Sequence, residues 1–138
     1  MATIIRPELS PSNKYYIDKH RYYELKHFCL QYSEWKKAYA ALDGYRKATT
    51  AVIFSRTNTH SDPTVKLAVL KSSYSNRIIL IERIATKTDP DLASYILKAV
   101  TEGLSYTNLK SRLDIPCSRD TYYDRYRRFF WLLDQERD

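Results

Sequence analysis

Glycine, cysteine and long apolar runs are scarce in this chain of 138 residues. Gly44 and Gly103 are its two glycines, and since sheets need glycine at turns and bulges, the shortage favours helices. Cys29 and Cys117 stand far apart without a CxxC partner, which argues against a disulfide scaffold or a zinc site and indicates a reduced, cytoplasmic protein. No run of about 18 apolar residues offers a membrane span. We therefore expect a soluble protein with no membrane partner.

Signatures of catalysis and of metal binding are missing as well. The sequence has no glycine-rich phosphate loop, no nucleophile elbow and no pair of acids at catalytic spacing. His20 and His27 lie seven residues apart, but no carboxylate accompanies them at metal-ligand spacing. We expect no enzymatic activity, no metal and no cofactor. The opening residues, MATIIRPELSPSNKYY, lack the apolar core of a signal peptide, which agrees with a cytoplasmic location.

Positive charge and tyrosine are what the chain has in excess. The formal net charge is +7, which favours a polyanionic partner, and thirteen residues are tyrosine. Residues 1–60 hold ten Lys and Arg against five Asp and Glu, whereas residues 105–138 hold seven against six. Charge alone therefore does not indicate that the C-terminal segment binds nucleic acid. The spacing of its residues is the stronger indication.

The N-terminal part predicts a loose arm over residues 1–14, then one long helix from Tyr15 that stops at Asp43-Gly44. Its apolar stripe recurs at steps of three and four: Tyr22, Leu25, Cys29, Tyr32, Trp35, Tyr39 and Leu42. We expect these aromatic residues to pack on the helix over 63–86. The alternative is a second nucleic-acid surface or a polymerase-docking helix. Residues 45–61 break the period and predict a loop of about 17 residues, with a short strand at 51–54 as the alternative.

Asp62 and Pro63 start the next helix, because Asp can cap it and Pro suits its first position. The apolar residues of this helix repeat near a 3.5 spacing, typical of the core of a monomer, with the seam of a homodimer as the alternative: Leu67, Leu70, Tyr74, Ile78, Ile81 and Ile84. Asp89-Pro90 repeats this combination of a capping Asp and a Pro at the first helical position, and it precedes a third helix that ends at Gly103. We divide the chain into an N-terminal part, 1–61, and a helical domain, 62–138.

Two more helices joined by a turn are predicted at the C-terminal end. Ser105 can cap a short helix over 106–113, and residues 114–117 turn the chain. Ser118 can cap a last helix of about 18 residues by accepting the N–H of Thr121. A supporting helix, a short helix, a turn and a longer helix are the proportions of a helix-turn-helix, over about 90–138. The fold class is therefore all-α, with long N-terminal helices followed by a C-terminal helix-turn-helix unit.

In such a unit the second helix places its N-terminal residues against base edges in the major groove. With Tyr122, Tyr126 and Phe129 facing the core, the opposite face carries the base-reading candidates Arg119, Asp120, Tyr123, Asp124 and Arg127. The phosphate candidates are hydroxyl or basic residues at the helix starts and flanks: Ser105, Thr107, Lys110, Arg112, Ser118 and Arg128. The alternative is two packed helices whose arginines are solvated or pair with Asp120, Asp124 and Asp134.

The stretch ILKAVTEGLSYTNLKSRLDIPCSRDTYYDRYRRFFWLL resembles the fourth conserved region of bacterial sigma factors. The shared points are EGLSY, the Leu109 and Leu113 pair, the IP turn and SRDTYY. The whole layout resembles phage late-gene transcriptional regulators of the RinA/ArpU type. The resemblance implies a sequence-specific double-stranded DNA-binding protein that regulates phage or prophage transcription at promoters, inside a bacterial host cell. Host RNA polymerase is then a second candidate partner, and a homodimer suits paired half-sites.

Two other functions fit the same helices. One is a small terminase-like subunit that recognises DNA for packaging, in which the long helices build a ring. The other is a host-directed protein-interaction module, such as an inhibitor, that grips a protein with the C-terminal unit.

Overall fold

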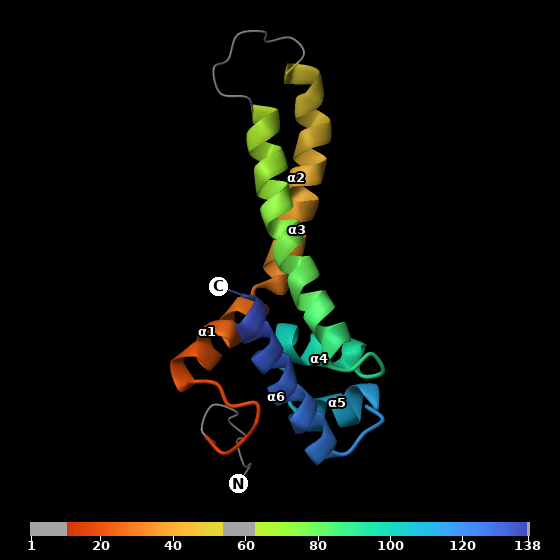
Figure 1. Cartoon of the computed structure of the whole chain (residues 1–138). Helices are drawn as coiled ribbons and strands as arrows, with labels where there is room; N and C mark the ends of the chain where they lie inside the picture. Colours follow the sequence, from red (N-terminus) through yellow and green to blue (C-terminus); the bar gives the residue numbers. More distant parts are fainter. Residues whose placement is uncertain (1–10, 54–62, 138) are drawn as a thin grey trace. The chain divides into compact units, whose positions relative to one another are not determined.

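The computed structural model of the chain describes residues 11–53 and 63–137, and its regular secondary structure is helix, without a strand in that part of the chain (Figure 1). The helices are α1 (Lys19–Leu30), α2 (Tyr32–Ile53), α3 (Pro63–Thr88), α4 (Ala93–Glu102), α5 (Tyr106–Leu113) and α6 (Arg119–Glu136). The all-α class predicted from the sequence is confirmed. Within the described ranges, none of these helices is both long and apolar enough to cross a bilayer.

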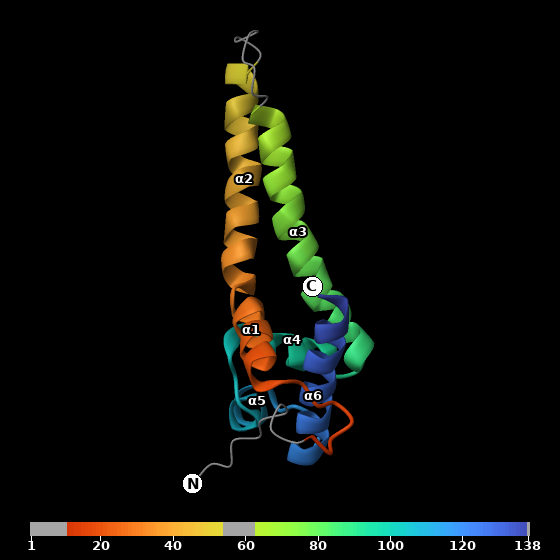
Figure 2. The same ribbon diagram turned by 60° about the vertical axis from the view of Figure 1, so that its left-hand side comes forward.

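The described residues form two compact units. The first contains the chain up to Gln31 and from Ile81 onward, and the second runs from Tyr32 to Leu80. α3 contributes to both, because its last turns belong to the first unit. In the second unit, α2 and α3 run side by side (Figures 1 and 2). The boundary that we expected between residues 61 and 62 lies outside the described residues.

The single N-terminal helix predicted from Tyr15 to Leu42 was wrong, because the chain is not helical before Lys19 and the helix breaks at Gln31. Ahead of α1, the Asn13 side chain accepts the N–H of Tyr15 at 2.8 Å, and this turn holds Tyr15 in the core. At the break, the Gln31 N–H donates to the carbonyl of Phe28 at 3.3 Å, three residues back. The Gln31 side chain donates to the carbonyl of His27, which is one of the carbonyls that lack an intrahelical partner at the end of a helix.

The stop predicted at Asp43-Gly44 was also wrong, since α2 continues through Gly44 to Ile53. The predicted loop is helical over residues 45–53, and the alternative strand is excluded over 51–53. A glycine inside a helix costs about 1 kcal/mol, which a long cooperative helix tolerates. Residues 54–61 of that loop lie outside the described part of the chain, as does Asp62.

Pro63 begins α3 as predicted, but only part of its expected apolar stripe is core. Ile81 and Ile84 are fully buried in the first unit, whereas Leu67 and Ile78 are half-buried and Leu70 is 47% exposed. The aromatic residues of the N-terminal stretch also divide between the units. The Tyr22 ring of α1 packs against α6, with its centroid 5.2 Å from that of Phe130. The rings of Trp35 and Tyr39 on α2 lie beside Arg77 and Lys71 of α3, as expected.

Asp89 is not the N-cap of α4, contrary to the prediction. Its Oδ1 accepts the N–H groups of Asp91 at 3.0 Å and Leu92 at 3.3 Å, which closes a turn before α4 begins at Ala93. Pro90 therefore lies in the turn rather than at the first helical position. Gly103 ends α4 as predicted, with a positive φ of 71° that residues other than glycine rarely adopt.

The core of the first unit sets the positions of α5 and α6. α1 and α4 both contact α6, and α4 also contacts α5. The largest fully buried side chains come from every helix of this unit and from the turn after α5: Leu25, Ile81, Ile84, Ile96, Leu109, Ile115, Tyr122, Phe129, Phe130 and Leu133. The pair α5 and α6 is thus mounted on a core that α1, α3 and α4 complete.

Candidate nucleic-acid interface

Serine side chains cap the start of both α5 and α6. The Ser105 hydroxyl accepts the N–H of Asn108 at 3.2 Å, and the Ser118 hydroxyl accepts the N–H of Thr121 at 3.2 Å. Each such cap stabilises its helix by about 1 kcal/mol. The helix starts at Tyr106 and Arg119 follow from these caps and agree with the prediction.

The turn between α5 and α6 is held by backbone and side-chain bonds. Asp114 ends α5 with a φ of 51°, in the left-handed region. Ile115 is fully buried, and its N–H donates to the Leu109 carbonyl at 3.3 Å. Lys110, one of the phosphate candidates, donates to the Ile115 carbonyl at 3.3 Å and lies 3.5 Å from the Asp114 carboxylate. Part of its role is therefore to stabilise the turn.

Tyrosines lock α5 onto α6. The Tyr106 hydroxyl donates to the Cys117 carbonyl at 2.6 Å, and its ring centroid lies 5.8 Å from that of Tyr122. Tyr122 is 1% exposed, and burial raises the pKa of its hydroxyl far above the usual range. Tyr122 is therefore a neutral part of the scaffold, and the two tyrosines together fix how the start of α6 lies against α5.

Arg119 connects the starts of the two helices. Its Nη2 lies 3.3 Å from the Thr107 hydroxyl on α5, and its guanidinium carbon lies 5.4 Å from the centroid of the Tyr106 ring. The structure thus brings a base-reading candidate, Arg119, together with a phosphate candidate, Thr107. Both side chains are exposed, so their remaining hydrogen-bonding capacity faces solvent.

The start of α6 is open to solvent in the chain. The exposed candidates surround the two capped helix starts and α5: Ser105, Thr107, Lys110, Arg112, Ser118, Arg119 and Asp120. α1 lies against the later turns of α6 instead. Its Arg21 Nε donates to Asp134 at 2.6 Å, and the Tyr22 hydroxyl is 2.6 Å from that of Tyr126. Asp134, a partner that the alternative interpretation gave to the α6 arginines, is therefore paired with α1.

Asp124 and Arg125 belong to a different cluster. Arg125 forms an ion pair with Asp124 and donates through Nε to Asp89 Oδ2 at 2.9 Å. Burial opposes ionisation of Asp89, but the hydrogen bonds from Arg125 and from two backbone N–H groups outweigh it and lower its pKa. Asp124 is half-buried beside this pair, so its carboxylate is already engaged.

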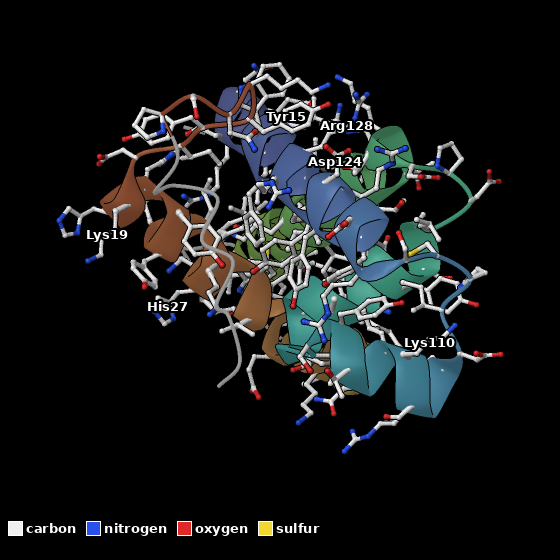
Figure 3. All side chains as sticks on the ribbon, turned by 90° about the horizontal axis from the view of Figure 1, so that it is seen from below. Tyr15, Lys19, His27, Lys110, Asp124 and Arg128 are labelled. Atoms are coloured by element: carbon white, nitrogen blue, oxygen red, sulfur yellow. The ribbon has the colours of Figure 1, made fainter. Side chains whose placement is uncertain are left out.

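Arg128 and Asp124 lie on one side of α6, whereas Lys110 lies on α5 across that helix (Figure 3). Arg128 donates to the Tyr15 hydroxyl at 3.4 Å and is half-buried. It therefore does not join the phosphate candidates of α5. Arg127 and Tyr123 are half-buried as well, and the Tyr123 ring packs on that of Tyr122 at 4.9 Å. Within the described residues, the Arg127 Nε is buried without a hydrogen-bond partner.

Three exposed Lys and His residues of α1 belong to the same unit and were not among the predicted site residues. Lys19, His20 and His27 are exposed, and Lys19 and His27 point away from the helix bundle (Figure 3). The interleaving of Lys and His with Tyr in this stretch was the available signal. The helix places its tyrosine Tyr22 inside and these Lys and His side chains outside, so one stretch serves both packing and a polar surface.

The described residues show little sign of chemistry at this site. They contain no group of three His, Cys, Asp or Glu arranged to hold a metal ion. Burial raises the pKa of the Cys117 thiol, which disfavours the reactive thiolate. What the arrangement offers is hydrogen-bond donors: two capped helix starts, hydroxyls and the exposed cations Lys110, Arg112 and Arg119.

Comparison of the chain with protein-family models, with curated proteins and with solved structures gives no match.

Proposed function

We propose that the chain is a sequence-specific double-stranded DNA-binding protein that regulates phage or prophage transcription at promoters. In this proposal α5 and α6 act as a helix-turn-helix, and the start of α6 enters the major groove. The observation that carries it is the exposed first turn of α6, with Arg119 held beside Thr107 at the start of α5.

Physical chemistry supports this surface as a ligand for duplex DNA. The starts of α5 and α6 each present backbone N–H groups and the positive end of a helix dipole, which favour phosphate. Arg119 is always charged and presents donors in a fork that matches the O6 and N7 of guanine. A major groove about 12 Å wide accepts a single helix with its side chains.

The structure favours some of the candidate residues over others. Arg119 and Asp120 are exposed at the first turn, and we assign base reading to them first. Tyr123 and Arg127 lie on the same face one turn later. They are half-buried, so their side chains have fewer conformations with which to reach a base. Asp124 is occupied by Arg125, so it holds that arginine rather than a base.

The structure also favours some of the phosphate candidates over others. Ser105, Thr107 and Ser118 place hydroxyls at the helix starts, and Arg112 is exposed on α5. Lys110 also holds the turn, and Arg128 lies on the other side of α6 as a flanking contact only.

Selection of bound fragments from random duplexes tests this proposal directly. The wild-type chain should enrich one sequence, and Arg119→Ala should weaken binding to it by about 1–3 kcal/mol while binding to unrelated duplexes changes less. Lys98→Ala is the matched control, because it removes one exposed positive charge from α4, where Lys98 pairs with Glu102. An equal loss on every sequence would make Arg119 a phosphate contact, and the absence of any enriched sequence would reject the proposal.

A further inference from the structure

Most of the positive charge of the chain belongs to the second unit, which runs from Tyr32 to Leu80. The sequence of this unit holds eight Lys and Arg against three Asp and Glu, a net charge of +5. The whole chain holds 23 against 16, which leaves 15 against 13 for the unit that contains α5 and α6. Repulsion between like charges destabilises a compact unit, so this excess favours a partner of opposite charge.

Cations of α3 lie over aromatic rings of α2. The Arg77 guanidinium carbon lies 5.6 Å from the Trp35 ring centroid, and the Lys71 Nζ lies 4.9 Å from that of Tyr39. Cation–π attraction to these rings holds the two cations in place. Trp35 and Tyr39 are four residues apart, about one turn of α2, so the two cations of α3 also lie about one turn apart along α2.

α2 adds two cations at the same level. Lys36 follows Trp35 directly, and its Nζ lies 4.9 Å from the Tyr32 ring centroid. The Lys37 side chain is 76% exposed and lies 3.9 Å from Glu34, the one acidic residue among the described side chains of this unit. Four cations from two helices thus share about two turns of α2 with one carboxylate. We call these four the basic cluster: Lys36, Lys37, Lys71 and Arg77.

The basic cluster suits the phosphates of a nucleic acid. Duplex DNA carries one negative charge for about every 1.7 Å of its axis, so a surface two helical turns long meets several phosphates at once. Arg77 is exposed, and its guanidinium presents the fork of N–H donors that matches phosphate oxygens. Contact with phosphates releases condensed counterions, whereas an exposed ion pair with a carboxylate of a protein contributes little. Charge and spacing therefore favour a nucleic acid over an acidic protein.

We propose that the basic cluster binds the phosphate backbone of duplex DNA without reading its sequence. This proposal rests on the proposed function for the identity of the polyanion, and it adds a second contact surface to the first turn of α6. Phosphate contacts supply affinity and salt dependence, and base contacts supply the choice of sequence. The cluster therefore strengthens binding to every duplex equally.

Salt-dependent binding of the full chain to the selected duplex and to an unrelated duplex tests the cluster. Lys37→Gln combined with Arg77→Gln should lower the magnitude of the slope of log K against log salt by about 2 on both duplexes, because two phosphate contacts are lost. The ratio of the affinities for the two duplexes should stay the same. Lys87→Gln combined with Lys98→Gln is the matched control. It removes two exposed charges that pair with Glu136 and Glu102 in the first unit, and it should leave the slope unchanged.

Two further variants separate loss of charge from loss of structure. Lys37→Arg combined with Arg77→Lys keeps both charges and should bind with the wild-type slope. Lys37→Gln alone changes a side chain that is 76% exposed and should lower the slope by about 1. Circular dichroism should show the same helix content in every variant.

An unchanged slope in the variant that lacks the charges of Lys37 and Arg77 would overturn the proposal and favour an acidic protein as the partner of the cluster. An equal loss in the control variant would also overturn it, because total charge and not the cluster would then be responsible. Selection that enriches no sequence would reject promoter recognition alone, since the slope on an unrelated duplex still tests the cluster.

Discussion

At the scale of single residues, the first unit depends on a few polar groups that reach across the sequence. Arg119 joins Thr107, Arg125 joins Asp89, and the Tyr22 hydroxyl meets that of Tyr126 at 2.6 Å. The first pair is exposed, whereas the other two are partly buried, and partly buried polar groups are costly to leave without a partner. Their removal therefore has effects that can be measured one residue at a time.

Tyr22→Phe should destabilise the protein by about 1–3 kcal/mol, because it leaves the Tyr126 hydroxyl without its partner. Burial also raises the pKa of Tyr126 far above its usual range, so this hydroxyl stays neutral and keeps its need for a hydrogen bond. Urea unfolding measures the change. Tyr16→Phe is the control, since Tyr16 is 39% exposed, and it should leave stability unchanged. Equal stability of the two variants would show that the hydroxyl pair contributes nothing.

Asp89→Asn should cost about 1–2 kcal/mol at neutral pH, through the weakened charge-assisted bond to Arg125. The pKa of Asp89 is lowered in the folded chain, so its contribution is present above the ordinary carboxyl pKa and is lost as the pH falls through the folded value. The difference between variant and wild type should therefore shrink in acid. Unfolding at neutral and acid pH tests this, with Asp91→Asn, at an exposed position, as the control. A difference that stays constant with pH would contradict it.

At the scale of elements, α5 and α6 begin where serine hydroxyls accept backbone N–H groups. Ser105 and Ser118 each bond to the residue three positions on, at 3.2 Å. These caps act within one turn of their helix and need no distant partner. They also set where the donors proposed to contact DNA begin.

Ser118→Ala should lower stability by about 1 kcal/mol, since the cap of α6 is lost. Ser118→Asp should keep the cap and the stability, because Asp is as good a cap as Ser. It also adds a negative charge where we propose that phosphate lies, so it should weaken binding to the selected duplex more than Ser118→Ala does. Thermal unfolding and gel-shift titration give the two readouts. Undiminished binding by Ser118→Asp would place DNA elsewhere on the protein.

At the scale of the whole molecule, the net charge of +7 governs association with polyanions and with other copies of the chain. The exposed cations that serve the proposed DNA surface lie on α5 and at the start of α6, and the exposed Lys19 of α1 belongs to the same unit.

DNA affinity should fall steeply with salt, with a slope of log K against log salt near −0.9 for each phosphate neutralised. Arg112→Ala should reduce the magnitude of this slope by about 1 if its exposed guanidinium contacts a phosphate. Lys98→Ala should leave the slope unchanged. Fluorescence anisotropy over a range of salt concentrations measures the slope for the wild type and for the two variants. A flat response of the wild type would exclude a phosphate-based contact.

Local chemistry made several helix starts and ends predictable. The caps at Ser105 and Ser118, the end of α4 at Gly103 and the start of α3 at Pro63 depend on residues within one helical turn. The candidate site was predictable to the same extent, because a cap and a helical period already determine which residues stand in the first turn of α6.

The remaining features depend on contacts between distant residues. The break at Gln31 and the passage of α2 through Gly44 follow no local signal that outweighs the periodic pattern. The pairing of Arg125 with Asp89 links α6 to the turn before α4, and the same arginine also engages Asp124. Periodicity identified an apolar stripe on α3, but burial shows that only its last members are core.

The sequence by itself therefore determined the all-α class and the helix ends that capping residues set, since these free energies arise within a few neighbouring residues. Only the tertiary structure decided which polar side chains are engaged, where α1 lies on α6 and which face of α3 is left exposed. Those outcomes depend on which surfaces exclude water together, and distance along the chain does not specify that.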